Sequence, residues 1–142
     1  MDRAEFEALR DLPGKRIDVD IILTRGAGAG TAQRSQRVPI VNGAGVLLQL
    51  DVTYNPQTNA KIMNVSSRTA GGPICRLCVD STVHKADGRD HKHSLRTPEC
   101  PSNNLPFATA RPELRGATIQ QVLAVFCEEA NITLNGQLRL PA

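Results

Sequence analysis

Apolar and polar residues alternate along much of the first eighty residues, a period of two that is typical of strands with one face in water. A first strand is predicted over residues 15–24, whose apolar positions are Ile17, Val19, Ile21 and Leu23. Further strands are predicted over 38–41, 46–54, 61–65 and 73–80. Short turns join them, including Asn42-Gly43, the dipeptide most typical of a hairpin. This order predicts an antiparallel sheet of about five strands.

Two segments have the helical period instead. Residues 2–11 suit a short helix with Asp2 as its cap. Residues 119–130 predict an amphipathic helix, because Thr118 and Gln121 can form a capping box before an apolar stripe. Asn131 is expected to end this helix, and residues 132–140 add a short strand or tail. The predicted fold class is therefore α+β, with the antiparallel sheet flanked by a short N-terminal helix and a C-terminal amphipathic helix.

The chain of 142 residues has the size of one domain, so 1–142 is predicted to fold as a single unit. Within it, residues 81–117 show no helical period and are expected to be irregular. All three histidines of the chain lie in this segment. A stretch of this length inside a compact domain is usually either functional or disordered, which makes it the first place to look for chemistry.

Composition narrows the classes of function. The net charge of +3 is compatible with an RNA or DNA partner if the basic residues are localised. With three Phe, one Tyr and no Trp, a base-stacking platform is not expected. No apolar run is long enough to cross a bilayer, and the N-terminus lacks the apolar core of a signal peptide. A cytoplasmic protein without a membrane partner is predicted, and its four cysteines are expected as thiols or metal ligands.

The Gly-rich stretch GAGAG at 26–30 follows a predicted strand, as a phosphate-binding loop would. It lacks the lysine and the glycine spacing of the known phosphate-binding motifs, and no helix begins after it. A hairpin loop is therefore predicted. Arg25, Arg34 and Arg37 make this loop a candidate contact for a polyanion.

The Cys75-x-x-Cys78 pair lies in a predicted strand, where positions three apart fall on opposite faces. A zinc site using both sulfurs would need the strand to break, with His84, His91, His93 or Cys100 completing the ligands. The H-x-H spacing is shorter than the spacing in a zinc finger. The alternative is that Cys127 and one of the pair are buried structural thiols.

The segment VHKADGRDHKHSL, residues 83–95, predicts a specific geometry. If Asp87-Gly88 forms a two-residue turn, His84 pairs with His91 across the hairpin. Directly opposite residues have Cβ atoms about 4.5–5.5 Å apart, and His93 lies on the same face as His91. Three imidazoles on one surface could hold a divalent metal or supply an acid and a base for phosphodiester cleavage. The basic residues near them in sequence are candidates for holding a phosphate: Arg76, Arg89, Lys92 and Arg96. The alternative is a solvated charged hairpin.

Residues 73–132 resemble a known group of proteins. The matching segments are Ile74-Cys75-Arg76-Leu77-Cys78-Val79, then His84, Gly88, Arg89 and His91-x-His93, and finally Phe126-Cys127-x-x-Ala130-Asn131-Ile132. This pattern resembles small uncharacterised prokaryotic proteins with an R-L-D motif, a histidine, a Gly-containing turn, H-x-H and a terminal helix. It is also similar to the TumE-like toxin components of toxin–antitoxin modules, which have an R-x-D…H…H-x-H core.

The resemblance implies that Arg76, His84, His91 and His93 form the functional set of a toxin that acts on RNA or on another target linked to nucleic acid. A cognate antitoxin would be its protein partner. This chain departs from the pattern at Cys78, which stands where the family has Asp. Asp80, two residues later, is expected to share a face of the strand with Cys78 and to be the candidate for the missing carboxylate. Two other functions remain as alternatives: a zinc-binding module that contacts nucleic acid or protein, and a mobile-element inhibitor without catalysis. Self-association is compatible with each of them.

Overall fold

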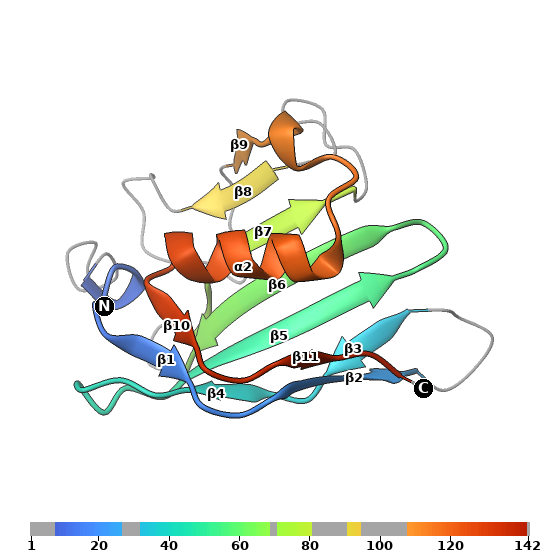
Figure 1. The fold of residues 1–142 in the computed structure, drawn as a ribbon. Coiled ribbons are helices and arrows are strands. Elements are labelled where there is room, and N and C mark those ends of the chain that lie inside the picture. The colour runs from blue at the N-terminus through green and yellow to red at the C-terminus, as the bar shows by residue number, and fades with distance from the viewer. Residues whose placement is uncertain (1–7, 27–31, 69–70, 81–90, 95–107, 142) are drawn as a thin grey trace.

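The computed structural model describes residues 8–26, 32–68, 71–80, 91–94 and 108–141, and of residues 91–94 and 108–110 it describes the backbone alone (Figure 1). Residues 8–10 are helical, and the remaining elements follow in chain order. They are β1 (Lys15–Ile17), β2 (Ile21–Arg25), β3 (Gln33–Ser35), β4 (Val38–Ile40), β5 (Leu48–Asn55), β6 (Ala60–Ser67), β7 (Gly72–Val79), β8 (His91–Ser94), β9 (Ala108–Ala110), the 3-10 helix η1 (Pro112–Leu114), α2 (Ile119–Glu129), β10 (Ile132–Leu134) and β11 (Leu138–Arg139).

The α+β class is confirmed, and the sheet is larger and more mixed than the five antiparallel strands predicted. Nine of the described strands form one sheet in the order β11-β2-β3-β5-β6-β7-β8-β9, with β4 beside β5. Neighbours from β2 to β9 are antiparallel, whereas β11 is parallel to β2. A separate parallel pair joins β1 to β10. The last residues of the chain thus pair with its first strands.

The strand predicted over residues 15–24 is interrupted between β1 and β2. Ile17, Ile21 and Leu23 are buried as expected, but Val19 is 44% exposed. The C-terminal segment causes the break, because the carboxylates of Asp18 and Asp20 accept hydrogen bonds from it. Asn135 Nδ2 donates to Asp18 Oδ1 at 2.8 Å, and the backbone N–H of Gln137 donates to Asp20 Oδ1 at 2.9 Å. These bonds lower the pKa of both carboxyl groups, with Arg16 helping at Asp18 and Arg139 at Asp20.

The predicted hairpin of β4 and β5 forms, but β4 ends at Ile40 and β5 begins at Leu48, so residues 41–47 connect the strands instead of a short Asn42-Gly43 turn. Val38 pairs with Leu50 and Ile40 with Leu48, on either side of the Asn42-Gly43 dipeptide. The Asn42 side chain organises the connection by accepting from the N–H groups of Ala44 and Val46. The Gly-rich loop is likewise flanked by paired strands, β2 and β3, as predicted for a hairpin.

The C-terminal helix is confirmed together with its boundaries. Thr118 Oγ1 accepts from Gln121 N at 3.1 Å, and Gln121 Oε1 accepts from Thr118 N at 2.9 Å, which completes the capping box. Asn131 takes the left-handed conformation, φ 58°, and ends the helix. No helix in the described part of the chain is long and apolar enough to span a membrane. Of the predicted N-terminal helix, residues 2–7 lie outside the described residues.

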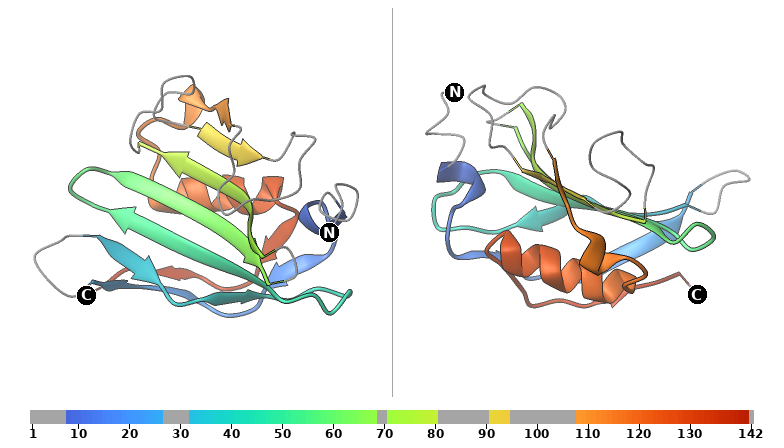
Figure 2. Two further views of the ribbon diagram at one scale, coloured as in Figure 1. Left: turned by 180° about the vertical axis from the view of Figure 1, so that it is seen from behind. Right: turned by 90° about the horizontal axis from the view of Figure 1, so that it is seen from above.

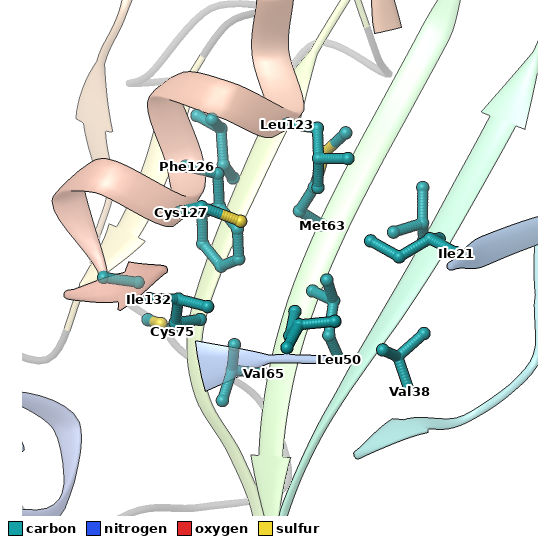
Figure 3. Close-up of a cluster of buried hydrophobic side chains, with 14 of the residues drawn as sticks. Ile21, Val38, Leu50, Met63, Val65, Cys75, Leu123, Phe126, Cys127 and Ile132 are labelled. Atoms are coloured by element: carbon teal, nitrogen blue, oxygen red, sulfur yellow. The ribbon is translucent and has the colours of Figure 1, made fainter. Parts of the chain in front are cut away.

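α2 covers one face of the sheet (Figure 2). Its buried side chains pack on alternate residues of β5, β6 and β7, as Figure 3 shows for Leu123, Phe126, Met63 and Leu50. The residues between these alternate positions lie on the other face of the sheet. The fold therefore buries one face under α2 and leaves a second face with a different composition.

The segment 81–117 contains more regular structure than predicted. It includes β8, which pairs with β7, and β9, which pairs with β8, followed by η1. β8 and β9 have four and three residues, too short for a period of two to stand out in the sequence.

Gly136 marks a close approach between the C-terminal segment and the turn after β1. A Cβ on this residue would lie 2.0 Å from the carbonyl oxygen of Val19 and 2.5 Å from its carbonyl carbon. Replacing Gly136 with alanine is therefore expected to lower the free energy of unfolding by roughly 1–3 kcal/mol, the usual cost of overpacking. Urea denaturation measures this change.

Gly43→Ala is the matched control, because a Cβ there meets nothing within 4 Å. It should leave stability unchanged or slightly raised. Equal stability of the two variants would contradict the close packing of the C-terminal segment on Val19.

Candidate functional site

The sheet face opposite α2 carries polar side chains over its central strands. We call it the polar face. It comprises the residues of β5, β6 and β7 that alternate with the buried core positions: Gln49, Asp51, Thr53, Ile62, Asn64, Ser66, Arg76 and Cys78. All of these are half-buried except Cys78, which is buried.

One row of residues crosses the polar face and contains two of the predicted site residues. The strand register pairs Asp51 with Asn64, Asn64 with Arg76, and Arg76 with His93. Arg76 Nε donates to Asn64 Oδ1 at 3.2 Å, and this bond orients the guanidinium group. Gln49 Nε2 donates to Asp51 Oδ2 at 3.3 Å at the other end of the row. Directly opposite residues of antiparallel strands share a face, so His93 is placed beside a held arginine.

The two histidines of the H-x-H motif fall on the polar face, as positions two apart on a strand must. His91 pairs with Cys78 on one side and with Ala110 on the other. The predicted pairing of His91 with His84 is therefore wrong, because both neighbours of His91 in the sheet are other residues. The strong hairpin signal of Asp87-Gly88 led to that prediction, while the pairing of β8 with the longer β7 decides the register.

Lys92 is separated from the other predicted phosphate-binding residues. Its register partner is Leu77, a core residue, so Lys92 belongs to the α2 side of the sheet rather than to the polar face. His84, Arg89, Arg96 and Cys100 lie outside the described residues, together with the Asp87-Gly88 turn.

Cys75 and Cys78 lie on opposite faces of β7, as predicted from their spacing. Cys75 belongs to the core under α2, near Cys127 (Figure 3), whereas Cys78 lies on the polar face. One metal ion cannot bind both sulfurs without breaking the strand, and β7 is continuous from Gly72 to Val79. Among the described residues, no group of three His, Cys, Asp or Glu side chains could hold a metal ion.

Burial suppresses the ionisation of two thiols. It raises the pKa of Cys78 to about 11, although the charge of Arg76 acts in the opposite direction. It raises the pKa of Cys127 to about 12, and the neighbouring Cys75 contributes to the increase. Both groups are thus neutral thiols at physiological pH, and Cys78 is unsuited to act as a nucleophile.

Alkylation of the native protein by iodoacetamide at pH 8 is expected to be slow at Cys78 and Cys127. A thiol with a pKa of about 11 is about 0.1% ionised at that pH, roughly 200-fold less than an ordinary cysteine. Mass spectrometry of the peptides gives the rate for each cysteine, and the urea-unfolded protein is the control. Modification of native Cys78 as fast as in urea would contradict its burial.

The prediction that Asp80 shares a face with Cys78 is wrong. The strand ends at Val79, and Asp80 turns away in the left-handed conformation, φ 54°. Its Oδ2 accepts from Lys61 Nζ at 2.9 Å, from Gly116 N at 3.0 Å and from Asn59 Nδ2 at 3.3 Å. Lys61 is fully buried, so Asp80 compensates an interior charge and joins β6 to the segment before α2. Its role is structural.

Asn64 and Asp51 are members of the row that sequence reasoning missed. Both occupy outward positions of alternating strands, and that alternation was visible in LQLDVTYN and AKIMNVSS. The alternation shows that Asp51 and Asn64 face away from the core. It does not show that Asn64 lies opposite Arg76, because that depends on the register of β6 with β7.

Comparison of the chain with models of protein families, with curated proteins and with solved structures finds no match.

Proposed function

We propose that the protein is a cytoplasmic ribonuclease of the toxin type, which binds single-stranded RNA on the polar face and cleaves its phosphodiester bonds. The observation that carries the proposal is the register that sets His93 directly opposite Arg76, with His91 two residues away on the same face. Arg76 is a suitable phosphate ligand because a guanidinium matches the geometry of two phosphate oxygens. Imidazoles near neutral pH supply both a proton acceptor and a proton donor.

In the proposed reaction, one of the two histidines removes the proton from the ribose 2′-hydroxyl, whose oxygen attacks the adjacent phosphorus. The bond from phosphorus to the 5′-oxygen breaks, and the other histidine gives that oxygen a proton. The products are a 2′,3′-cyclic phosphate and a 5′-hydroxyl. Arg76 stabilises the negative charge that grows on the phosphate oxygens. The reaction requires the 2′-hydroxyl, which distinguishes RNA from DNA.

The hydrogen bond between Arg76 and Asn64 supports this role for Arg76. Asn64 accepts from Nε, so the guanidinium plane is fixed before a phosphate arrives, and less side-chain freedom is lost on binding. A toxin of this kind would be neutralised by a protein antitoxin that covers the polar face.

The test is hydrolysis of a labelled single-stranded RNA by the purified protein and by its His91→Ala/His93→Ala variant. The wild-type protein should cleave the RNA and inhibit growth when expressed, and the double variant should do neither. Equal cleavage by the two proteins would contradict the proposal. Metal analysis of protein purified without chelators separates this function from a zinc-binding module, because stoichiometric zinc without RNA cleavage would favour the module.

A further inference from the structure

A groove lies at one end of the polar face, next to the Arg76 row. Its volume is about 720 Å³. Its described lining includes Pro39 of β4, Gln49 of β5 and Ser66 of β6, together with Arg37 before β4, Leu47 before β5 and Arg68 after β6.

The groove opens onto the polar face, as the register of its floor demonstrates. Pro39 pairs with Gln49, and Gln49 pairs with Ser66, which forms a second row across the sheet. This row is two residues along the strands from Asp51 and Asn64, so the groove begins roughly 7 Å from the Arg76 row. Between Val65 and Ser66 the register shifts by a β-bulge, which changes the direction of the strand at the groove.

The side chains of the groove suit a polymeric ligand that is both anionic and partly apolar. Arg37 and Arg68 are exposed, and no acidic residue is among the described residues that line the groove. Leu47 is 69% exposed there and offers an apolar surface beside the two cations. A nucleic-acid strand matches this arrangement, because every nucleotide places a phosphate beside a base face.

We propose that this groove is a second subsite for the RNA strand, in which Arg37 and Arg68 hold phosphates further along the strand than the one bound by Arg76. The proposal rests on the function proposed above and extends it. It predicts that the protein binds oligonucleotides of several residues much more tightly than a dinucleotide, which reaches only the Arg76 row.

The test is the affinity of the full chain for a fluorescent 2′-O-methyl RNA of twelve nucleotides, which cannot be cleaved, at several salt concentrations. Arg37→Ala/Arg68→Ala should weaken binding about tenfold and reduce the slope of log Kd against log salt by about 1.4, the effect of two lost phosphate contacts on a single strand. Cleavage of a dinucleotide should stay unchanged, since neither arginine belongs to the Arg76 row. Arg25→Ala/Arg115→Ala is the control, because it removes the same charge from two exposed arginines that do not line the groove.

Unchanged affinity and slope in the groove variant would overturn the subsite, and cleavage of the dinucleotide would leave the proposed ribonuclease standing. Binding of the long RNA through the groove without any cleavage by the wild-type protein would support the subsite and reject the ribonuclease. A glutamate-rich peptide of twelve residues that bound more tightly than the RNA, and lost this affinity in the groove variant, would overturn the assignment to RNA.

Discussion

Replacing Asp80 with asparagine is expected to lower the free energy of unfolding by about 3 kcal/mol, because the change leaves the fully buried ammonium group of Lys61 without its counter-charge. Asparagine keeps the shape of the side chain and tolerates the left-handed conformation of residue 80, so the loss reports the charge rather than the backbone. Asn59 O still accepts from Lys61 Nζ at 2.7 Å, which keeps the cost at the lower end of the range for broken buried pairs. Urea denaturation gives the value.

A second change should restore part of this loss. Lys61→Met in the Asp80→Asn background removes the buried charge and puts an apolar side chain of similar length in its place. The double variant is expected to be more stable than Asp80→Asn alone, and the two single variants complete a double-mutant cycle. A loss below about 0.5 kcal/mol in Asp80→Asn would contradict the structural role. If Asp80→Asn instead had normal stability but no longer cleaved RNA, Asp80 would have the catalytic role that the resemblance implies.

Replacing Arg76 with glutamine is expected to reduce RNA cleavage by roughly 100-fold, the usual effect of removing one group that stabilises charge in a transition state. The glutamine can still bond Asn64, so folding should be preserved. Lysine at this position should recover only part of the activity, because it cannot present two N–H groups to one phosphate. Initial rates on a short labelled RNA, with the unfolding midpoint measured in parallel, separate the chemical effect from a folding defect.

Arg25→Gln is the matched control for Arg76→Gln. Arg25 is also an exposed arginine of the sheet, but it lies two residues from the buried Leu23 on β2 and therefore on the face opposite the polar face. Its replacement should leave the cleavage rate within a factor of about three. Asn64→Ala should have an intermediate effect, since it releases Arg76 Nε without removing the charge. Equal rates for the wild-type protein and Arg76→Gln would remove Arg76 from the site.

The elements set by local pattern could be predicted from the sequence. The capping box of Thr118 and Gln121 fixes the start of α2, and the Asn42 turn fixes the β4–β5 hairpin, because both depend on residues a few positions apart. The same local reasoning placed Cys75 and Cys78 on opposite faces. It also selected Arg76, His91 and His93 as candidates, and the register brings these three residues to one face.

The parts that could not be predicted depend on pairings between distant segments. The break between β1 and β2 requires Asn135 and Gln137, more than a hundred residues later in the chain, to bond Asp18 and Asp20. Asp80 faces Lys61 because the chain turns sharply after Val79, and no spacing rule encodes that turn. The neighbours of His91 are set by the long β7 strand rather than by the short turn signal at Asp87-Gly88.

We propose that the polar face, with His91 and His93 beside Arg76, cleaves RNA through the 2′-hydroxyl. This reaction is tested by comparing a labelled single-stranded RNA with the same strand carrying deoxyribose at every position, using the wild-type protein and His91→Ala/His93→Ala. Only the wild-type protein with the RNA should yield fragments, and these should end in 2′,3′-cyclic phosphates. Equal cleavage by the double variant, or no cleavage of RNA by the folded wild-type protein, would rule out this reaction.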